Sequence, residues 1–445
     1  MIPTKSLLRI YDLVFKRSLL IEYKNLSGNS YASIDTINKY QQDQLKSILD
    51  YASQNSPFYK RIFNESKRDL KNHSCLKILN KLPILTKNMI LQNLNEFLSV
   101  EYKNTNKLCF DHTGGSSGQP LKFAYDSNYK DFRWAVIYHN LSWVGYKMGD
   151  CHGFAYGSNY DASRQYSFRQ KLQDWMMNAF QVNAFFLNDK ELNIFAKKCL
   201  KKRPKFLIGY ASALFEFSRY VETNELPIKF DFVESTSEYL SNEMREHIER
   251  IFKCKVYDRY GCREVGNIAH ECHLHNGLHI NWQSVYVEII NKGAYPSLGP
   301  EYGDIVISSL KNKGMPLLRY NVGDIGKINE LKCKCGIESH RIFLVGTRSG
   351  DLLFNNDGSL VSPTAITILY RDLVGIERIQ FVQESVSYLK VNILKNHDYT
   401  DEVSTILKNR IKKVFGRNTE LSLNFVDKIE KEQSGKYRLT KRLFQ

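Results

Sequence analysis

A glycine- and hydroxyl-rich loop at residues 112–120 is the stretch of this chain best suited to chemistry. It separates two apolar runs, 108–110 and 121–125, so we expect a turn between two strands. Glycines let a backbone approach a ligand closely, and successive N–H groups in such a turn can bind an anion. The lysine of a Walker loop is absent, because Gln119-Pro120 occupies its place. The loop indicates a phosphate site of another kind, or a surface turn, and its candidate ligand-binding residues are Thr113, Gly114, Gly115, Ser116, Ser117 and Gly118.

Three acidic residues follow at points where further strands should end. Ser237 and Glu238 stand in a hydroxyl-rich turn after the apolar run 230–233. Glu264 comes three residues after Gly261, where its carboxylate could hold a Mg²⁺ ion bound to phosphates or pair with a nearby arginine. Asp324 follows a glycine at an expected turn, where it could accept two ribose hydroxyls or cap the turn.

Four further residues form a candidate metal site. Three cysteines and one histidine make a complete tetrahedral zinc set, and a closed set of this kind indicates a structural role. Free cysteines are the alternative, and His273 or His275 could replace His279 as a ligand. The nine cysteines of the chain are irregularly spaced and no export signal is evident, which favours reduced thiols. The predicted ligands are Cys272, His279, Cys333 and Cys335.

The elements that must position these residues alternate between strands and helices. Such alternation predicts parallel strands joined by helical crossovers, with ligands bound where loops leave the carboxyl ends of the strands. A helical leader covers about residues 1–100, and Pro57 should end one of its helices. Strands are expected at 154–156, 182–187, 206–208, 230–233, 285–290 and 303–310, and helices at 164–180, 189–202, 211–223 and 239–252.

Composition describes an ordinary globular protein. The chain has 445 residues, of which 42% are hydrophobic and 25% charged, and its apolar runs are too short to span a membrane. A cytoplasmic location is the default expectation. The net charge of +16 suits nucleic acid, an anionic membrane or phosphorylated substrates, although no dense basic block appears. Residues 6–22 form an amphipathic helical face that could lie on a membrane or pack on its own domain.

Four separated segments, in order and in approximate spacing, resemble the motifs of the adenylate-forming enzymes. The branch they resemble is that of the phenylacetate-CoA ligases and their relatives associated with capsular polysaccharide. The segments are the loop at 112–120, Tyr260-Gly261 with Glu264, Arg319-Tyr320 with Gly323-Asp324, and the hinge-like stretch 346–351. The resemblance implies that the loop binds ATP phosphates, Tyr260 lies against adenine, and Asp324 and Arg348 bind near the ribose. Gly350 departs from the acidic residue usual at the hinge, and Arg263 from the usual small hydroxyl residue.

The resemblance also implies two domains: a large nucleotide- and acyl-binding domain over 1–347 and a small mobile α+β lid over 348–445. Alternating apolar residues at 389–393 and 421–425 predict strands in the second domain, with a helix between them from Thr400 to Gly416. The segment Ser434-Gly435-Lys436-Tyr437-Arg438 is similar to the one that carries the family's adenylation lysine, so Lys436 is the expected catalytic residue together with Glu264.

These features predict an α/β enzyme that uses ATP and Mg²⁺ to convert a carboxylic acid into an acyl-adenylate. The acyl group then passes to a thiol, with CoA as a candidate cofactor, or to an amine. One alternative is transfer to an amino sugar or amino acid in surface-polysaccharide synthesis. A zinc-stabilised basic protein that binds nucleic acid is the alternative of a different class, although no nucleic-acid partner is expected. Aromatic residues that could line an acyl pocket, or simply pack in the core, are Trp143, Phe154, Tyr156, Tyr160 and Tyr210.

Overall fold

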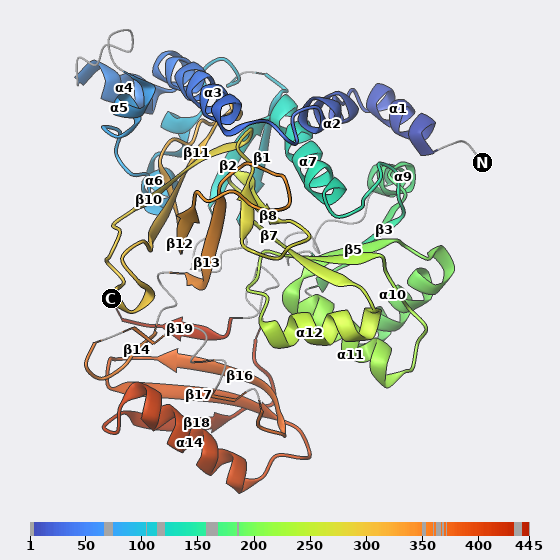
Figure 1. Ribbon diagram of the computed structural model, residues 1–445, viewed down its shortest axis with the longest axis vertical. Coiled ribbons are helices and arrows are strands. Elements are labelled where there is room, and N and C mark those ends of the chain that lie inside the picture. Colours follow the sequence, from blue (N-terminus) through green and yellow to red (C-terminus); the bar gives the residue numbers. More distant parts are fainter. Residues whose placement is uncertain are drawn as a thin grey trace.

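The computed structural model has a mixed α/β architecture, with a large sheet flanked by helices and a small C-terminal unit (Figure 1). This confirms the predicted fold class. The residues that the structure describes are 4–65, 74–103, 105–113, 121–156, 168–184, 187–348, 353–358, 360–361, 366, 369–370, 372–430 and 438–444. No helix among them is long and apolar enough to cross a membrane.

Among the described residues, six helices precede the first strand. They are α1 (Thr4–Val14), α2 (Leu19–Ser27), α3 (Ile34–Asn55), α4 (Pro57–Glu65), α5 (Cys75–Leu79) and α6 (Lys87–Phe97). The helical face expected over residues 6–22 is therefore broken into two helices. Lys16 has a left-handed φ of 50°, and Asp131 accepts a hydrogen bond from the Ser18 backbone N–H at 2.8 Å. Pro57 separates two helices as predicted, and it also begins α4 because proline suits the first turn of a helix.

The central sheet has eleven strands in the order β10-β11-β12-β13-β9-β8-β7-β6-β5-β3-β4. The strands β4, β3, β5, β6 and β7 are parallel, as the alternation with helices predicts, and the remaining neighbours are antiparallel. Their bounds are β3 (His152–Ala155), β4 (Ala179–Val182), β5 (Phe206–Tyr210), β6 (Phe232–Thr236), β7 (Lys255–Cys262), β8 (Gly266–Glu271), β9 (Leu278–Ile280), β10 (Val285–Ile290), β11 (Gly303–Ser309), β12 (Tyr320–Asn329) and β13 (Arg341–Arg348).

Helices cover both faces of the parallel strands. On one face lie α10 (Asp189–Lys202), α11 (Ala211–Thr223) and α12 (Asn242–Phe252), which share a core with Leu207, Val233 and Val256. On the other lie α7 (Ser127–Ser142) and α9 (Phe168–Met176), with α1 and α2 packed outside them (Figure 1). The strand expected at 182–187 lies earlier: β4 runs from Ala179 to Val182, and residues 185 and 186 lie outside the described residues.

A third core joins the antiparallel strands to α3 through α6 and to a separate hairpin. That hairpin consists of β1 (Leu108–His112) and β2 (Lys122–Asp126), paired so that His112 lies opposite Lys122. The glycine-rich loop connects these two strands, as expected. A short 3-10 helix, η2 (Pro296–Leu298), lies between β10 and β11.

The C-terminal unit has its own core and a four-stranded sheet in the order β18-β17-β16-β19. Its helix α14 (Asp401–Phe415) begins at the predicted cap, where the Thr400 side chain accepts from the Val403 N–H, and ends at Gly416 with φ 104°. The remaining strands are β14 (Leu353–Phe354), β15 (Leu360–Val361), β16 (Ile376–Gln383), β17 (Tyr388–Lys395), β18 (Glu420–Phe425) and β19 (Thr440–Arg442).

Candidate active site and metal centre

Tyr260 and Asp324 meet across the sheet. The Tyr260 hydroxyl on β7 donates a hydrogen bond of 2.8 Å to Asp324 Oδ2 on β12. Three strands separate β7 from β12 in the sheet order, and neighbouring strands lie about 4.8 Å apart. The contact therefore requires the sheet to curve until its two parts face each other. Two residues predicted to bind one adenosine are thus brought together from positions 64 apart in the chain.

Glu264 lies beside the same pair. It stands in the turn between β7 and β8, and its Oε1 accepts a hydrogen bond of 2.9 Å from the Tyr320 hydroxyl at the start of β12. The Glu264 residue is 8% exposed, so this contact fixes a largely buried carboxylate. Carboxylate oxygens are ligands that Mg²⁺ prefers, and Glu264 could supply one here. Tyr320 belongs to a segment that the resemblance identified, but its role in holding Glu264 carried no sequence signal.

The base of the glycine loop is tied to this region. The Thr113 N–H donates to the Leu121 carbonyl at 2.9 Å, and the Thr113 hydroxyl accepts from the Leu121 N–H at 2.9 Å. Arg263, next to Glu264, donates to the His112 carbonyl at 3.1 Å. Predicted phosphate-loop residues Gly114, Gly115, Ser116, Ser117 and Gly118 lie outside the described residues, as does Lys436.

Two local expectations about this site are wrong. Asp324 does not lie in a turn but inside β12, where the pairing with β13 shifts between Asp324 and Gly326. Gly323, with φ 82°, allows this irregularity. Gly261 likewise lies within β7, whose register shifts between Tyr260 and Gly261, and the turn comes later, at 263–265. A glycine in a strand pattern signals a bulge as readily as a turn.

Ser237 and Glu238 lie just beyond the carboxyl end of β6. Ser237 has a left-handed φ of 68°, and Glu238 Oε2 accepts a hydrogen bond of 2.8 Å from the Ser212 N–H in the first turn of α11. That contact stabilises the helix N-terminus. Arg348 ends β13, and its backbone pairs in register with Asp324, so the predicted ribose-binding residues are neighbours in the sheet.

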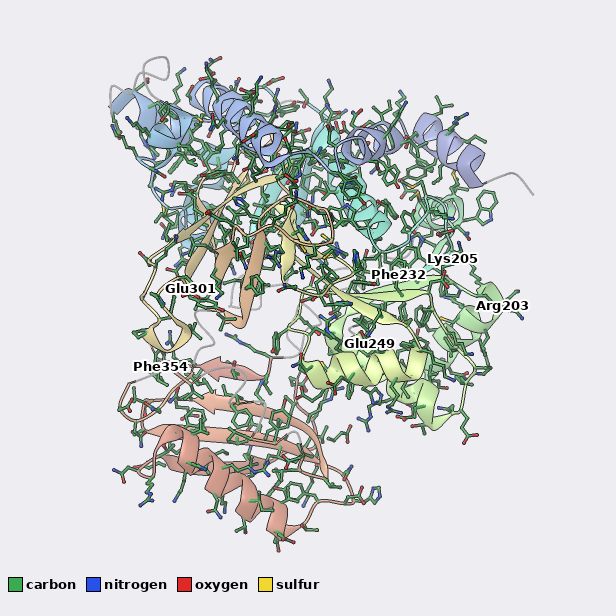
Figure 2. The ribbon with its side chains drawn as sticks, viewed as in Figure 1. Arg203, Lys205, Phe232, Glu249, Glu301 and Phe354 are labelled. Carbon is green, nitrogen blue, oxygen red and sulfur yellow. The ribbon has the colours of Figure 1, made fainter. Side chains whose placement is uncertain are left out.

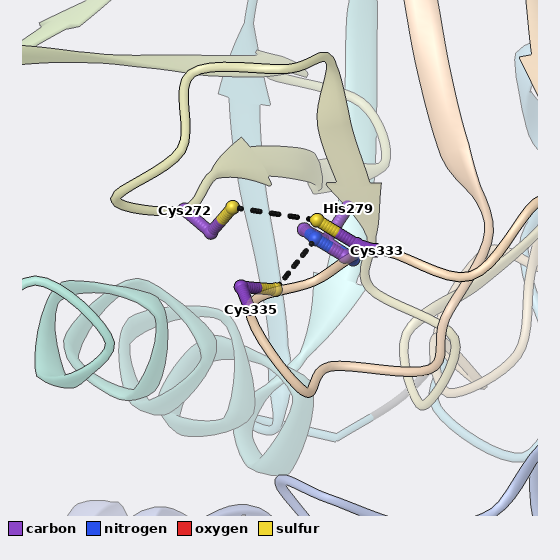
Figure 3. A group of neighbouring side chains, drawn as sticks. All are labelled: Cys272, His279, Cys333 and Cys335. Carbon is purple, nitrogen blue, oxygen red and sulfur yellow. Dashed lines mark hydrogen bonds between the residues drawn. The ribbon is translucent and has the colours of Figure 1, made fainter.

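The four predicted metal ligands converge on one point. The ligand atoms of Cys272, His279, Cys333 and Cys335 all lie within 4.8 Å of one another (Figure 3). The Cys272 and Cys333 sulfurs are 4.0 Å apart, and Cys335 Sγ is 3.3 Å from His279 Nε2. For Zn–S bonds of about 2.3 Å, tetrahedral geometry puts ligand sulfurs roughly 3.8 Å apart, so the donor set fits zinc.

Neighbouring contacts orient the histidine of this group. His279 Nδ1 lies 3.1 Å from the Ser339 carbonyl, which can only accept, so Nε2 is left as the ligand atom facing the cysteines. His275, the alternative ligand, instead lies with Nδ1 3.1 Å from Glu271 Oε2. The group joins the loop after β8 and strand β9 to the loop between β12 and β13, which precedes Arg348.

Sequence reasoning missed a polar cluster on the α7 side of the sheet. Glu234 on β6 is fully buried, and it contacts Arg259 on β7 and His270 on β8. Charged residues inside strands that are otherwise apolar were the available signal.

Comparison with known proteins places this architecture in one class. The chain has the fold of a 2-hydroxyisobutyryl-CoA ligase captured in its postadenylation state with an acyl-AMP, with a TM-score of 0.71, 16% identity, and coverage of 92% of this chain and 90% of that one. The same ligase in its thioesterification state gives a TM-score of 0.59. These likenesses confirm the adenylate-forming enzyme fold.

The sequence comparisons lead to a particular group of relatives. Residues 353–443 match the CapK C-terminal domain model. Protein CapK of Staphylococcus aureus is 26% identical over 420 residues, covering 89% of this chain and 87% of that protein. The phenylacetate-coenzyme A ligase of Thermus thermophilus is 23% identical over 73% of each chain. The resemblance to adenylate-forming enzymes is therefore confirmed, and it includes CapK-like relatives as well as the phenylacetate-CoA ligases.

Proposed function

We propose that this chain is an ATP- and Mg²⁺-dependent ligase that converts a carboxylic acid into an acyl-adenylate and then transfers the acyl group to an acceptor. The observation that carries the proposal is the contact of Tyr260 with Asp324 beside the Glu264 carboxylate and the base of the glycine-rich loop. The residues proposed to bind adenine, ribose and Mg²⁺ are therefore linked by direct contacts or lie on neighbouring strands. The adenylate-forming relatives support the same activity.

Each residue has a distinct task in the proposed reaction. Tyr260 supports the adenine and Asp324 accepts the ribose hydroxyls, with Arg348 assisting. Glu264 holds the Mg²⁺ ion, which neutralises phosphate charge when bound. The carboxylate of the substrate attacks the α-phosphorus, the bond to the bridging oxygen breaks, and pyrophosphate leaves. Lys436 stabilises the charge that develops on these oxygens, an effect worth roughly 10²- to 10³-fold in rate.

The acceptor in the second step is either a thiol or an amine. CoA as acceptor is supported by the phenylacetate-coenzyme A ligases among the relatives. An amino sugar or amino acid, in surface-polysaccharide synthesis, is the acceptor suggested by the resemblance of the sequence motifs to the capsule-associated branch. Incubation of the enzyme, ATP and its acid with CoA or with amino sugars, followed by mass spectrometry of the product, distinguishes the two versions.

Carboxylate-dependent pyrophosphate exchange tests the first step. Labelled pyrophosphate should enter ATP only when a suitable acid is present, and Lys436→Ala should remove the exchange while ATP binding, measured by calorimetry, changes little. Normal exchange by Lys436→Ala would show that the lysine is misassigned. Absence of exchange with a broad acid panel, combined with tight and salt-dependent DNA binding, would instead favour the nucleic-acid-binding class.

We also propose that Cys272, His279, Cys333 and Cys335 hold a structural zinc ion. All four ligand positions come from the protein, which leaves none for a substrate, and the group joins β9 to the loop that leads into β13. Metal analysis of protein purified without a polyhistidine tag should find about one zinc per chain. Cys333→Ser should lose that zinc and lower the melting temperature, whereas Cys199→Ser, a buried cysteine elsewhere, should keep it. A metal-free preparation with full stability would contradict the proposal.

A further inference from the structure

A buried charged cluster lies on the face of the sheet that α7 covers. Arg259 Nε is 2.6 Å from Glu234 Oε1, and His270 Nε2 is 2.9 Å from Glu234 Oε2. Side chains alternate along a strand, so Glu234 points to the same face as Phe232, which is labelled in Figure 2 and stacks on Phe206 with 4.9 Å between ring centroids. Both phenylalanines belong to the core shared with α7.

The cluster lies next to the proposed nucleotide site. Arg259 directly precedes Tyr260 and pairs in register with Thr236, the last residue of β6. Ligands bind at the carboxyl ends of parallel strands, which is where this arginine stands. Because Tyr260 and Arg259 are consecutive in β7, their side chains emerge on opposite faces. Arg259 is therefore placed to contact a different part of a bound acyl-adenylate from the part that Tyr260 contacts.

Two aromatic residues expected to form an acyl pocket, Tyr156 and Trp143, lie near this charged cluster. Burial raises the pKa of Tyr156, and the nearby positive charge of Arg259 opposes that rise. The ring of Tyr156 lies 6.2 Å from that of Tyr210, and Trp143 lies 6.0 Å from His270 between ring centroids. Tyr160, the other aromatic residue considered for this role, lies outside the described residues. The charged cluster thus lies close to residues that could line an acyl pocket.

A second arginine in the same region shows what a fully satisfied guanidinium looks like. Arg245 Nη2 and Nη1 donate to the two Glu271 oxygens at 2.9 and 3.1 Å, and Nη1 also contacts the Val256 carbonyl and His275. The terminal nitrogens of Arg245 are thus bonded to other groups of the protein, as expected for a structural ion pair.

Arg259 is different. In the described part of the chain, Arg259 Nε forms an ion pair with Glu234 Oε1. Both atoms are buried, and their geometry is not that of an aligned hydrogen bond. The side chain is only 12% exposed. The two terminal nitrogens carry four N–H donors. Unlike Nε, they are not among the fully buried atoms of the described chain, so a ligand could reach them. A ligand that brings paired oxygen acceptors would satisfy them.

Glu234 accounts for how the arginine is held. Burial raises the pKa of Glu234, but the opposing effects of Arg259 and His270 are together larger. The pKa is therefore below its usual value, and the carboxylate is charged. With one oxygen facing His270 and the other facing Arg259 Nε, Glu234 anchors the guanidinium by its inner edge. The outer edge, Nη1 and Nη2, has the planar geometry that recognises a carboxylate or phosphate through two parallel hydrogen bonds.

We propose that Arg259 determines substrate specificity by binding a second anionic group on the carboxylic acid that this enzyme activates. The inference rests on the proposed adenylating function and adds the chemical class of the acid: one carboxylate reacts at the α-phosphate, and another anionic group is held by Arg259. Glu234 is a positioning residue in this arrangement.

Pyrophosphate exchange with matched acids tests this inference. The pairs are butyrate with succinate, hexanoate with adipate, and phenylacetate with homophthalate. At least one dianionic acid should exceed its monoanionic partner in kcat/KM by about 10²-fold, because a site built to bind a polar group disfavours an analogue that lacks it. Arg259→Met should abolish this preference, mainly by raising KM for the dianionic acid, so that both acids of a pair are used with similar kcat/KM. Arg259→Lys keeps the positive charge but loses the planar guanidinium, so it should retain part of the preference for the dianionic acid.

Arg245→Met is the matched control, because it also removes an arginine paired with a buried glutamate. It should lower the melting temperature without changing the ratio between paired acids. Exchange that is equally fast with both members of every pair, or a preference that survives in Arg259→Met, would overturn the inference while leaving the adenylating function standing. Absence of exchange with every acid would count against the function itself.

Discussion

Asp174, on α9, is a residue whose ionisation should oppose folding. Its Oδ2 atom is buried and has no hydrogen-bond partner in the described part of the chain. Burial raises the pKa of Asp174 from 3.8 to about 6, and Lys202 only partly opposes this rise. Because the folded chain binds this proton more tightly than the unfolded chain does, ionisation destabilises the fold. The cost is absent below the unfolded pKa of 3.8, grows as pH rises, and is complete above about 6.

Asp174→Asn should therefore stabilise the protein only at higher pH. We expect the free energy of unfolding to rise by about 1 kcal/mol at pH 8, a figure discounted for partial solvent screening, and to stay unchanged at pH 4. Urea denaturation at both pH values measures the effect. Asp427→Asn, at an exposed loop position, should change neither value. A gain of the same size at both pH values would contradict the assignment to ionisation.

Single residues of the site were predictable where their chemical type was decisive. Glu264 and Asp324 were singled out by their resemblance to family motifs and the four metal ligands by their residue types, and the structure brings each group together. Their functional roles remain predictions. Their backbone setting was less predictable: Asp324 lies in a bulged strand, since a glycine can mark either a bulge or a turn. Glu234, Arg259 and His270 could not be grouped at all, because their contacts depend on strand register, which the sequence alone does not reveal.

At the scale of elements, α1 has more apolar surface than its neighbours cover. Leu8 and Tyr11 are buried, yet on the other side of the helix Leu13 is 79% exposed, Val14 59% and Ile10 41%. Arg9 and Lys16 are exposed beside this surface. An apolar helical face bordered by cations suits an anionic membrane surface.

Leu13→Glu should weaken binding to vesicles that contain an anionic phospholipid. Burial of a leucine side chain contributes roughly 1.5 to 3 kcal/mol, so the partition constant should fall by about tenfold or more. Co-sedimentation with phosphatidylglycerol vesicles measures it, and high salt should weaken binding of the unaltered protein too. The control is Val374→Glu, which adds a charge at a residue 67% exposed in the C-terminal unit. Equal binding by all three proteins, or none by the unaltered one, would contradict the membrane contact.

Elements with strong periodicity matched the structure closely. Helices α10 and α11 and strand β10 have the predicted bounds. For α10 the reason is local, because Asn188 caps its start and Arg203 ends it in a left-handed conformation. The helical face over residues 6–22 was not recognised as two helices, since its break depends on Asp131, more than a hundred residues away. Long-range contacts of this kind override local pattern.

At the scale of the whole molecule, an ion pair joins the C-terminal unit to α11. Arg378 on β16 pairs with Glu216 on α11. The overall arrangement matches the postadenylation form of the 2-hydroxyisobutyryl-CoA ligase better than its thioesterification form, with TM-scores of 0.71 and 0.59. The ion pair therefore belongs to the arrangement that resembles the first of these forms.

Arg378→Ala should shift the balance between the two half-reactions. Loss of a partly buried ion pair costs about 1 kcal/mol or more, so adenylation, followed by pyrophosphate exchange, should slow by about fivefold or more. Acyl transfer from a preformed adenylate should stay unchanged or become faster, because the ion pair no longer stabilises the arrangement that competes with the one used for transfer. Glu216→Ala should have the same effect, and the double variant should add little. Arg410→Ala, which removes an exposed ion pair within the C-terminal unit, is the control and should leave both half-reactions unaltered. Equal slowing of both steps would instead indicate that Arg378 contributes to stability alone.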